Sequence, residues 1–227
     1  GMDEYVQDCF GFSGFIYSQT IVFQENFEGT TTLVSSSSTG SGAWGISSTL
    51  FSQGVKSDSA AISTGDTIYL TTNSFATTGN SFVTLEFDHI AKIEFFDAAR
   101  IEVSGDNGAT WTALTFNEYT GNGGTQAFST GKFTSTSYLD WLPANNAAVP
   151  TNSWWKSESF DISTLAGNKA NVKIRFALMD ENGTGGVGNY GWLIDDIKVS
   201  ASFSELIPPS VVLAQPIMMD TVTNIGP

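Results

Sequence analysis

The sequence predicts an all-β protein built as a jelly-roll β-sandwich. Many short segments rich in β-branched and aromatic residues follow one another, with turn residues between them, a pattern typical of sandwiches and barrels. The sequence contains no run of consecutive segments with helical periodicity. Along the strongest segments apolar and polar residues alternate, which indicates strands with one buried face.

The clearest strands lie near the C-terminal end. Residues 172–179 (VKIRFALM) place an apolar side chain at every second position, so we expect a strand there. A polar, glycine-rich connector over 180–191 leads to a second expected strand, 192–199 (WLIDDIKV). The adjacent carboxylates Asp195 and Asp196 interrupt its apolar run. Because burying an unpaired carboxylate is costly, we expect one to face solvent and the other to meet a cation, backbone amides or a metal.

These end segments carry a family resemblance. Residues 191–197 (GWLIDDI) are similar to the closing strand of the bacterial choice-of-anchor J and cleaved-adhesin modules, which are similar to animal MAM domains. Residues 23–29 (FQENFEG) resemble the opening strand of those modules. The resemblance covers roughly residues 20–200. It implies a concanavalin- or MAM-like jelly roll in a secreted or cell-surface bacterial protein, and it does not imply an enzyme.

Further strands are expected between these two ends. The first covers 20–27, and a loop rich in Ser, Thr and Gly follows over 30–45 with Trp44 as its anchor. Residues 117–153 are polar, dotted with aromatic residues and almost without periodicity. The other expected strands, in chain order, are 60–63, 67–70, 81–90, 92–96, 99–104, 110–116 and 157–162, and a turn or single helical turn is expected at 165–171.

We expect the sandwich to span residues 20–200. Residues 1–19 are interpreted as an expression scar, from Gly1 before Met2, plus a leader remnant or N-terminal extension. Residues 201–227 are interpreted as a linker and the first strand of a truncated following immunoglobulin-like domain, because a proline pair precedes a new apolar run. A single strand is not stable alone, so it should be disordered or add to a sheet edge.

The charge balance limits the classes of partner. Lys and Arg number 9 against 23 Asp and Glu, a net charge of −14. Nucleic acid and anionic membranes both require a basic face, so neither is expected, whereas cation binding and simple extracellular solubility both fit. No segment reaches about 18 consecutive apolar residues, so we expect no membrane insertion. Cys9 is the only cysteine, which excludes an internal disulfide.

Carboxylates at both ends of the domain point to a structural calcium ion, which prefers oxygen ligands. Glu28 closes the first strand and Asp196 lies in the last, and these strands can run side by side in a jelly roll. Similar carbohydrate-binding jelly rolls hold calcium between a Glu after the first-strand Phe and an Asp near the C-terminus, which implies Glu28 with Asp195 or Asp196. The loop 54–59 could add carbonyl groups and Asp58. The alternative is that these acids only accept hydrogen bonds from backbone amides.

Residues 104–111 (SGDNGATW) match the Asp-box pattern S-x-D-x-G-x-T-W, which resembles the repeats of sialidase propellers. The pattern occurs once, so we interpret it as a structural turn. Asp106 can accept hydrogen bonds from the amides of its own turn, Gly108 can take the positive φ of a tight hairpin, and Trp111 can pack beneath.

Aromatic residues crowd the long 117–155 region. Trp154 and Trp155 are adjacent on an expected extended chain, so one should point inward and the other outward. The outward ring, with Trp141 or Tyr138, is predicted to contact a glycan or a surface protein. The alternative is that these rings are anchors folded over the sandwich.

No catalytic pattern stands out. The single histidine, His89, lies in an expected strand, and neither a nucleophile elbow nor a zinc-ligand set is present in the sequence. Glu86, Asp88 and Glu94 could form a glycosidase pair, but their alternation equally describes a solvated sheet face. We therefore predict a non-catalytic adhesion or binding module of a larger protein, in contact with neighbouring domains. The alternatives are a carbohydrate-binding module attached to a hydrolase and, third, a lectin-like glycosidase.

Overall fold

A computed structural model describes residues 16–61, 65–121, 127–142, 148–181 and 190–205. Residues 18–203 form one unit, and the described residues outside this range, 16–17 and 204–205, belong to a second. The expected leader remnant before residue 16 and the expected next domain after residue 205 lie outside the described residues.

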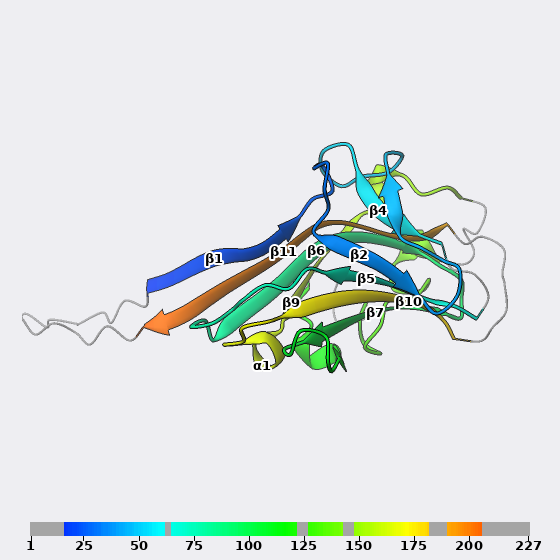
Figure 1. Cartoon of the computed structure of the whole chain (residues 1–227). Helices are drawn as coiled ribbons and strands as arrows, with labels where there is room; N and C mark the ends of the chain where they lie inside the picture. The colour runs from blue at the N-terminus through cyan, green and yellow to red at the C-terminus, as the bar shows by residue number, and fades with distance from the viewer. Residues whose placement is uncertain (1–15, 62–64, 122–126, 143–147, 182–189, 206–227) are drawn as a thin grey trace, which may run out of the picture. The chain divides into compact units, whose positions relative to one another are not determined.

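The described chain forms two antiparallel sheets that face each other (Figure 1). The first has the strand order β3 (Gly45–Ser47), β4 (Ser57–Ala60), β11 (Gly191–Glu205), β6 (Phe82–Lys92) and β9 (Lys156–Asp161), with β1 (Ile16–Glu25) also paired to β11. The second has the order β2 (Val34–Ser38), β5 (Thr67–Thr72), β10 (Lys173–Asp180), β7 (Asp97–Ser104) and β8 (Thr112–Ala113). This confirms the predicted all-β jelly-roll sandwich.

The helices of the described residues are single turns in the connections. They are α1 (Ser163–Ala166) and the 3-10 turns η1 (Phe116–Glu118), η2 (Leu139–Trp141) and η4 (Asn152–Trp154). Among the described residues no helix has both the length and the apolar character needed to cross a bilayer.

The core lies between the sheets and is dominated by aromatic rings. Phe176 of β10 meets Phe87 of β6 at a ring-centroid distance of 5.0 Å and Trp192 of β11 at 5.9 Å, so one ring joins the two layers. Val172 and the inward side chains of β10, including Phe176, are fully buried, which confirms the alternation seen in the sequence. Fully burying one such side chain contributes about 1.5–3 kcal/mol.

The segment 30–45, expected to be a loop, contains the edge strand β2. Its serines carry little apolar surface, so no period of two is visible in the sequence. Main-chain pairing with β5 defines the strand instead, as in the pair Ser36 and Leu70. Trp44 is buried against Trp192 at 5.6 Å and anchors the following chain.

Two expected boundaries are also corrected. β1 covers Ile16–Glu25 where a strand over 20–27 was expected, and β11 covers Gly191–Glu205 where one over 192–199 was expected. The strand expected over 92–96 does not form, because β6 ends at Lys92 and the chain turns before β7. The exposed rings of Phe95 and Phe96 lie in that turn.

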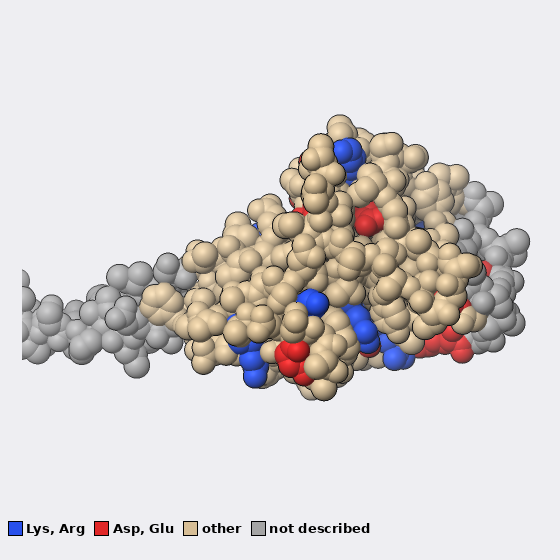
Figure 2. Space-filling model, in the orientation of Figure 1, with Lys and Arg blue, Asp and Glu red and all other residues tan. Residues whose placement is uncertain are grey.

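Although the net charge is −14, the acidic side chains do not form one continuous patch on the face shown in Figure 2. That face shows scattered basic and acidic side chains surrounded by uncharged surface.

Candidate functional site

A β-bulge interrupts β11 at the paired aspartates. Asp195 pairs with Asp88 of β6, and the next registered pair is Lys198 with Glu86, so β11 carries one extra residue there. Asp196 accordingly has a positive φ of 48°, a region that residues other than glycine seldom occupy. The bulge sends the two neighbouring carboxylates into different surroundings.

The carboxylates of Asp195 and Asp196 differ in burial and in hydrogen bonding. Asp195 is fully buried, and its Oδ2 accepts hydrogen bonds from the amides of Ser52 (2.8 Å) and Gln53 (3.3 Å). Its Oδ1 accepts from the amide of Asp196 at 2.8 Å. Asp196 is half-buried, and its Oδ2 is shielded from solvent without a hydrogen-bond partner among the described residues. Of the options that the sequence left open, Asp195 therefore uses backbone amides.

The acids predicted to bind calcium do not converge as a set. Glu28 uses Oε1 to accept hydrogen bonds from the amides of Val55 and Lys56, both at 2.8 Å. Asp58 is buried elsewhere, where the charge of Glu25 acts on it. Within the described ranges, no group of three or more His, Cys, Asp or Glu residues is arranged to hold a metal ion.

Asp196 nevertheless lies in an unfavourable electrostatic position. Burial, followed by repulsion from Asp88 and Glu28, raises the pKa of Asp196, and Lys198 offsets only part of this. A half-buried carboxylate with a shielded, unpartnered oxygen gains from a nearby cation.

Trp141, predicted to contribute to a ligand surface, is 0% exposed. Its ring lies edge-on to that of His89 at 4.9 Å, and its indole N–H donates to the carbonyl of Trp154 at 3.4 Å. Tyr138 stacks edge-on against Trp141 at 4.6 Å and turns its hydroxyl inward to Glu158. The prediction is wrong for Trp141, because core packing covers its ring, and the structure gives Tyr138 an inward hydrogen bond instead of a free hydroxyl.

Trp154 and Trp155 are half-buried, and both pack against the core. The ammonium of Lys92 lies 5.8 Å from the ring centroid of Trp154, and it donates to the carbonyls of Trp141 and Leu142 at 3.2 and 2.9 Å. Burial lowers the pKa of this lysine. These contacts favour the anchoring alternative for this part of the 117–155 region.

Glu158 is the centre of a buried hydrogen-bond network. It is 2% exposed, and its carboxylate accepts from the hydroxyls of Tyr119 (2.7 Å) and Tyr138 and from Nε2 of His89 (3.3 Å). The other ring nitrogen of His89, Nδ1, accepts from the indole N–H of Trp192 at 3.1 Å. The imidazole proton is therefore assigned to Nε2, where it faces the carboxylate.

The network also positions a surface hollow. Tyr119 directly follows η1, and its ring lies 5.7 Å from that of Phe128. Phe128 contacts Phe133 at 4.7 Å, and Phe133 exchanges two main-chain hydrogen bonds of 2.9 Å with Ala99 of β7. Residues 127–133 are thus held between Tyr119 and β7.

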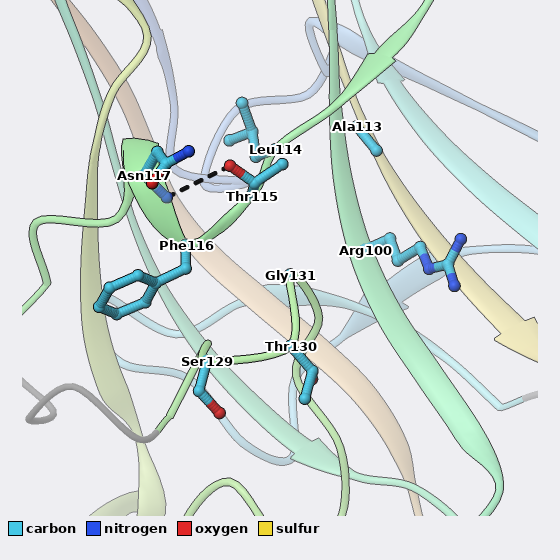
Figure 3. Close-up of a pocket in the computed structure, with 9 residues that line it drawn as sticks. All are labelled: Arg100, Ala113, Leu114, Thr115, Phe116, Asn117, Ser129, Thr130 and Gly131. Atoms are coloured by element: carbon cyan, nitrogen blue, oxygen red, sulfur yellow. Dashed lines mark hydrogen bonds between the residues drawn. The ribbon is translucent and has the colours of Figure 1, made fainter.

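This hollow has a volume of about 480 Å³ and lies between residues 113–117 and residues 129–131, with Arg100 of β7 at one side (Figure 3). Of the described residues, nine line it and none of the nine is acidic, although the protein has 23 Asp and Glu. They are Arg100, Ala113, Leu114, Thr115, Phe116, Asn117, Ser129, Thr130 and Gly131.

The wall that carries Phe116 is fixed by a capping box. The Thr115 hydroxyl accepts from the amide of Asn117 at 3.2 Å (Figure 3), and Glu118 accepts from the amide and hydroxyl of Thr115 at 2.8 and 2.7 Å. These bonds satisfy the free amides at the start of η1. Phe116 remains 42% exposed in this fixed turn.

A separate hollow of about 290 Å³, the acidic hollow, lies on the first sheet. It includes Glu86 and Asp88, two of the carboxylates considered for a glycosidase, but not Glu94. Glu86 is paired with Lys198 at 2.8 Å. The full lining is Gln24, Glu86, Phe87, Asp88, Ser157, Glu158, Asp196 and Lys198, so this hollow is acidic.

The Asp-box segment forms a tight turn in the structure. Asp106 accepts from the hydroxyl and amide of Thr110, and these bonds lower the pKa of Asp106 to about 2. Gly108 has a φ of 91°. Trp111 packs on the guanidinium of Arg175 at 4.2 Å. These contacts agree with the structural role predicted for Asp106, Gly108 and Trp111.

Sequence reasoning missed Phe116, Asn117 and residues 129–131. A usable signal was present, because Thr115 and Glu118 have the spacing of a capping box. That spacing predicts a fixed turn in which an aromatic residue occupies the first position.

Comparison with known proteins finds no matching family model and no matching curated protein. Similar solved structures include the CBM22-1 xylan-binding domain from Paenibacillus barcinonensis, with a TM-score of 0.47 and 12% identity over 82% of this chain and 97% of that chain. The K2 cleaved adhesin domain of Lys-gingipain has a TM-score of 0.46 and 15% identity over 79% and 98%. TmCBM61 in complex with β-1,4-galactotriose has a TM-score of 0.42 and 14% identity, over 76% of this chain and 88% of that chain.

The Glu158 network predicts a large loss of stability in the variant Glu158→Ala. The buried imidazole of His89 and the hydroxyls of the half-buried Tyr119 and Tyr138 would lose their acceptor, so we expect the free energy of unfolding to fall by about 3–5 kcal/mol. Urea unfolding measures this change. Glu86→Ala is the matched control, because its exposed ion pair is worth at most about 1 kcal/mol. Equal losses in the two variants would contradict the role of the network.

Three buried aspartates predict a stability that falls with rising pH. Burial raises the pKa of Asp58, Asp97 and Asp195 from 3.8 to about 6. The folded state therefore holds these protons more tightly than the unfolded chain, and the stabilisation present below about pH 4 is lost as the pH rises through about 6. We expect the melting temperature to fall between pH 5 and about 7.5, with a weaker fall in Asp97→Asn. A melting temperature that rises over this interval would be incompatible with these shifts.

Proposed function

We propose that this chain is a non-catalytic carbohydrate-binding module of a secreted or cell-surface bacterial protein, and that the hollow beside Phe116 binds the glycan. The observation that carries the proposal is the lining of this hollow. An exposed aromatic ring stands beside neutral hydrogen-bonding groups, and no described residue of the lining is acidic. A sugar matches this combination, because its C–H face packs on a flat ring while its hydroxyls bond to polar groups.

Each wall supplies a different part of the recognition. The Phe116 ring offers the flat apolar surface, and the Asn117 side chain offers both donors and an acceptor for sugar hydroxyls. Ser129 and Thr130 add hydroxyl groups on the opposite wall. Because the capping box and the contacts of Phe128 fix both walls before a ligand arrives, little entropy is lost on binding.

The chemistry of the lining supports binding without conversion. Glycoside hydrolysis requires a carboxylic acid and a second carboxylate across the sugar, and neither is supplied by the nine described residues that line this hollow. Such a module can serve adhesion or can deliver a linked domain to a glycan, and either use places it beside other domains of a larger protein.

The proposal predicts glycan binding that depends on Phe116. We expect a neutral glycan on an array to bind the wild-type protein, and Phe116→Ala to weaken binding about tenfold in calorimetry, equivalent to about 1.4 kcal/mol. Phe82→Ala is the matched control, since Phe82 is 45% exposed and does not line the hollow. The proposal fails if no glycan binds or if the two variants behave alike.

We also propose a structural calcium ion at Asp196. The buried, unpartnered Oδ2 of Asp196 supports it, as do the neighbouring charges of Asp88 and Glu28. Asp196 and Glu28 would hold the ion through carboxylate oxygens, and calcium would neutralise their repulsion. Asp195 already accepts hydrogen bonds from backbone amides, so its role is to support the bulge.

Calcium in excess over a chelator should raise the melting temperature by about 5–10 °C, as expected for a ligand that binds only the folded state. Asp196→Asn should abolish this response, and it should raise the melting temperature in chelator because an unpaired carboxylate is removed. Asp140→Asn, which alters an acid paired with Lys156, is the control and should keep the calcium response. Identical melting temperatures with calcium and with chelator would refute this site.

A further inference from the structure

A second hollow adjoins the one beside Phe116. It has a volume of about 260 Å³, and Ser129 and Thr130 line both hollows. Its lining is rich in hydroxyl groups and, among the described residues, contains no acid. The residues are Phe95, Ala127, Ser129, Thr130, Lys132, Thr134, Thr136 and Ser137.

The lining of this second hollow also includes an exposed aromatic ring, which does not line the first hollow. Phe95 is 60% exposed, and its ring meets that of Phe96 edge-to-face at 5.0 Å. The turn that carries them is closed by Asp97, whose carboxylate accepts from the amide of Glu94 at 3.0 Å. Phe95 is therefore a supported platform, as Phe116 is in the first hollow.

The basic residues at the two hollows are already paired. Arg100 lines the first hollow and Lys132 the second, and both bind the carboxylate of Glu181, Arg100 at 2.9 Å. The charges of Glu181 and Asp180 act on Asp97 as well. The described residues of the two hollows therefore present hydroxyls and aromatic rings but no free cation for an anionic ligand, which favours an uncharged ligand.

We propose that the two hollows form one extended site for a linear, uncharged oligosaccharide, with Phe116 and Phe95 as stacking platforms at its two ends. This inference rests on the proposed function, because it extends the same site. Each hollow is small and open, so one sugar unit makes few contacts. A chain whose units repeat hydroxyls along its length can bond to the shared wall and reach both rings, and each linked contact then forms at a high effective concentration.

The test compares short and long chains by calorimetry. The probes are the dimers and hexamers of β-1,4-linked xylose, galactose and glucose. For at least one sugar, the hexamer should bind at least tenfold more tightly than the dimer. Phe95→Ala should remove most of this advantage and leave dimer binding unchanged, whereas Phe116→Ala should weaken both. Phe82→Ala should alter neither, and all three variants should melt like the wild type because these rings are exposed.

The possible outcomes separate this inference from the proposed function. Equal binding of dimer and hexamer, or a hexamer indifferent to Phe95→Ala but sensitive to Phe116→Ala, overturns the extended site and leaves glycan binding intact. Binding of only branched or single sugars also overturns the extended site and leaves glycan binding intact. A galacturonic acid hexamer that binds more tightly than every neutral hexamer overturns the uncharged ligand. Binding of a decaproline peptide with no glycan bound overturns both proposals.

Discussion

A buried carboxylate must receive hydrogen bonds from the protein, and Glu158 receives them from three separate parts of the chain. His89 brings in β6, Tyr119 the end of η1, and Tyr138 the chain before η2. Leaving such a group unpaired would cost several kcal/mol. The network therefore fixes how the described parts of the connection between β8 and β9 that carry Tyr119 and Tyr138 lie on the sandwich. Through Tyr119 and Phe128 it also fixes both walls of the hollow beside Phe116.

The same device recurs around the fold and accounts for part of the unusual acidity. Asp66 accepts from the amides of Gly40 and Gly42, Glu28 from those of Val55 and Lys56, and Asp195 from those of Ser52 and Gln53. In a chain with 9 basic residues against 23 acids, backbone amides replace basic side chains as partners. Hydrogen bonds of this charge-assisted kind are stronger than neutral ones. The loops are thereby held close to the sheets, which is a suitable base for a preorganised binding site.

The sequence predicts those features that depend on neighbours along the chain. The alternation over 172–179 marks the inward face of β10, and the adjacent Asp195 and Asp196 mark a place where burial and charge conflict. It could not predict that Trp141 is covered, because its neighbour His89 is distant in sequence, and the Tyr138 and Glu158 pair spans 20 residues. The spacing of Thr115 and Glu118 indicates the turn that carries Phe116, but the hydrogen bond that ties the following residue Tyr119 to Glu158 joins residues 39 apart and is not visible in the sequence. Local periodicity reports which face of a strand is buried, and it carries no information about which loop covers that strand.

We propose that the preorganised hollow beside Phe116, whose described lining residues include no acid, binds a neutral glycan. Backbone amide chemical shifts in ¹⁵N-labelled protein, followed while the glycan that binds best on the array is added, test it most directly. The account predicts that the largest shift changes fall on residues 113–117 and 129–131. Changes centred instead on the acidic hollow of the first sheet, at Glu86, Asp88 and Asp196, would contradict it.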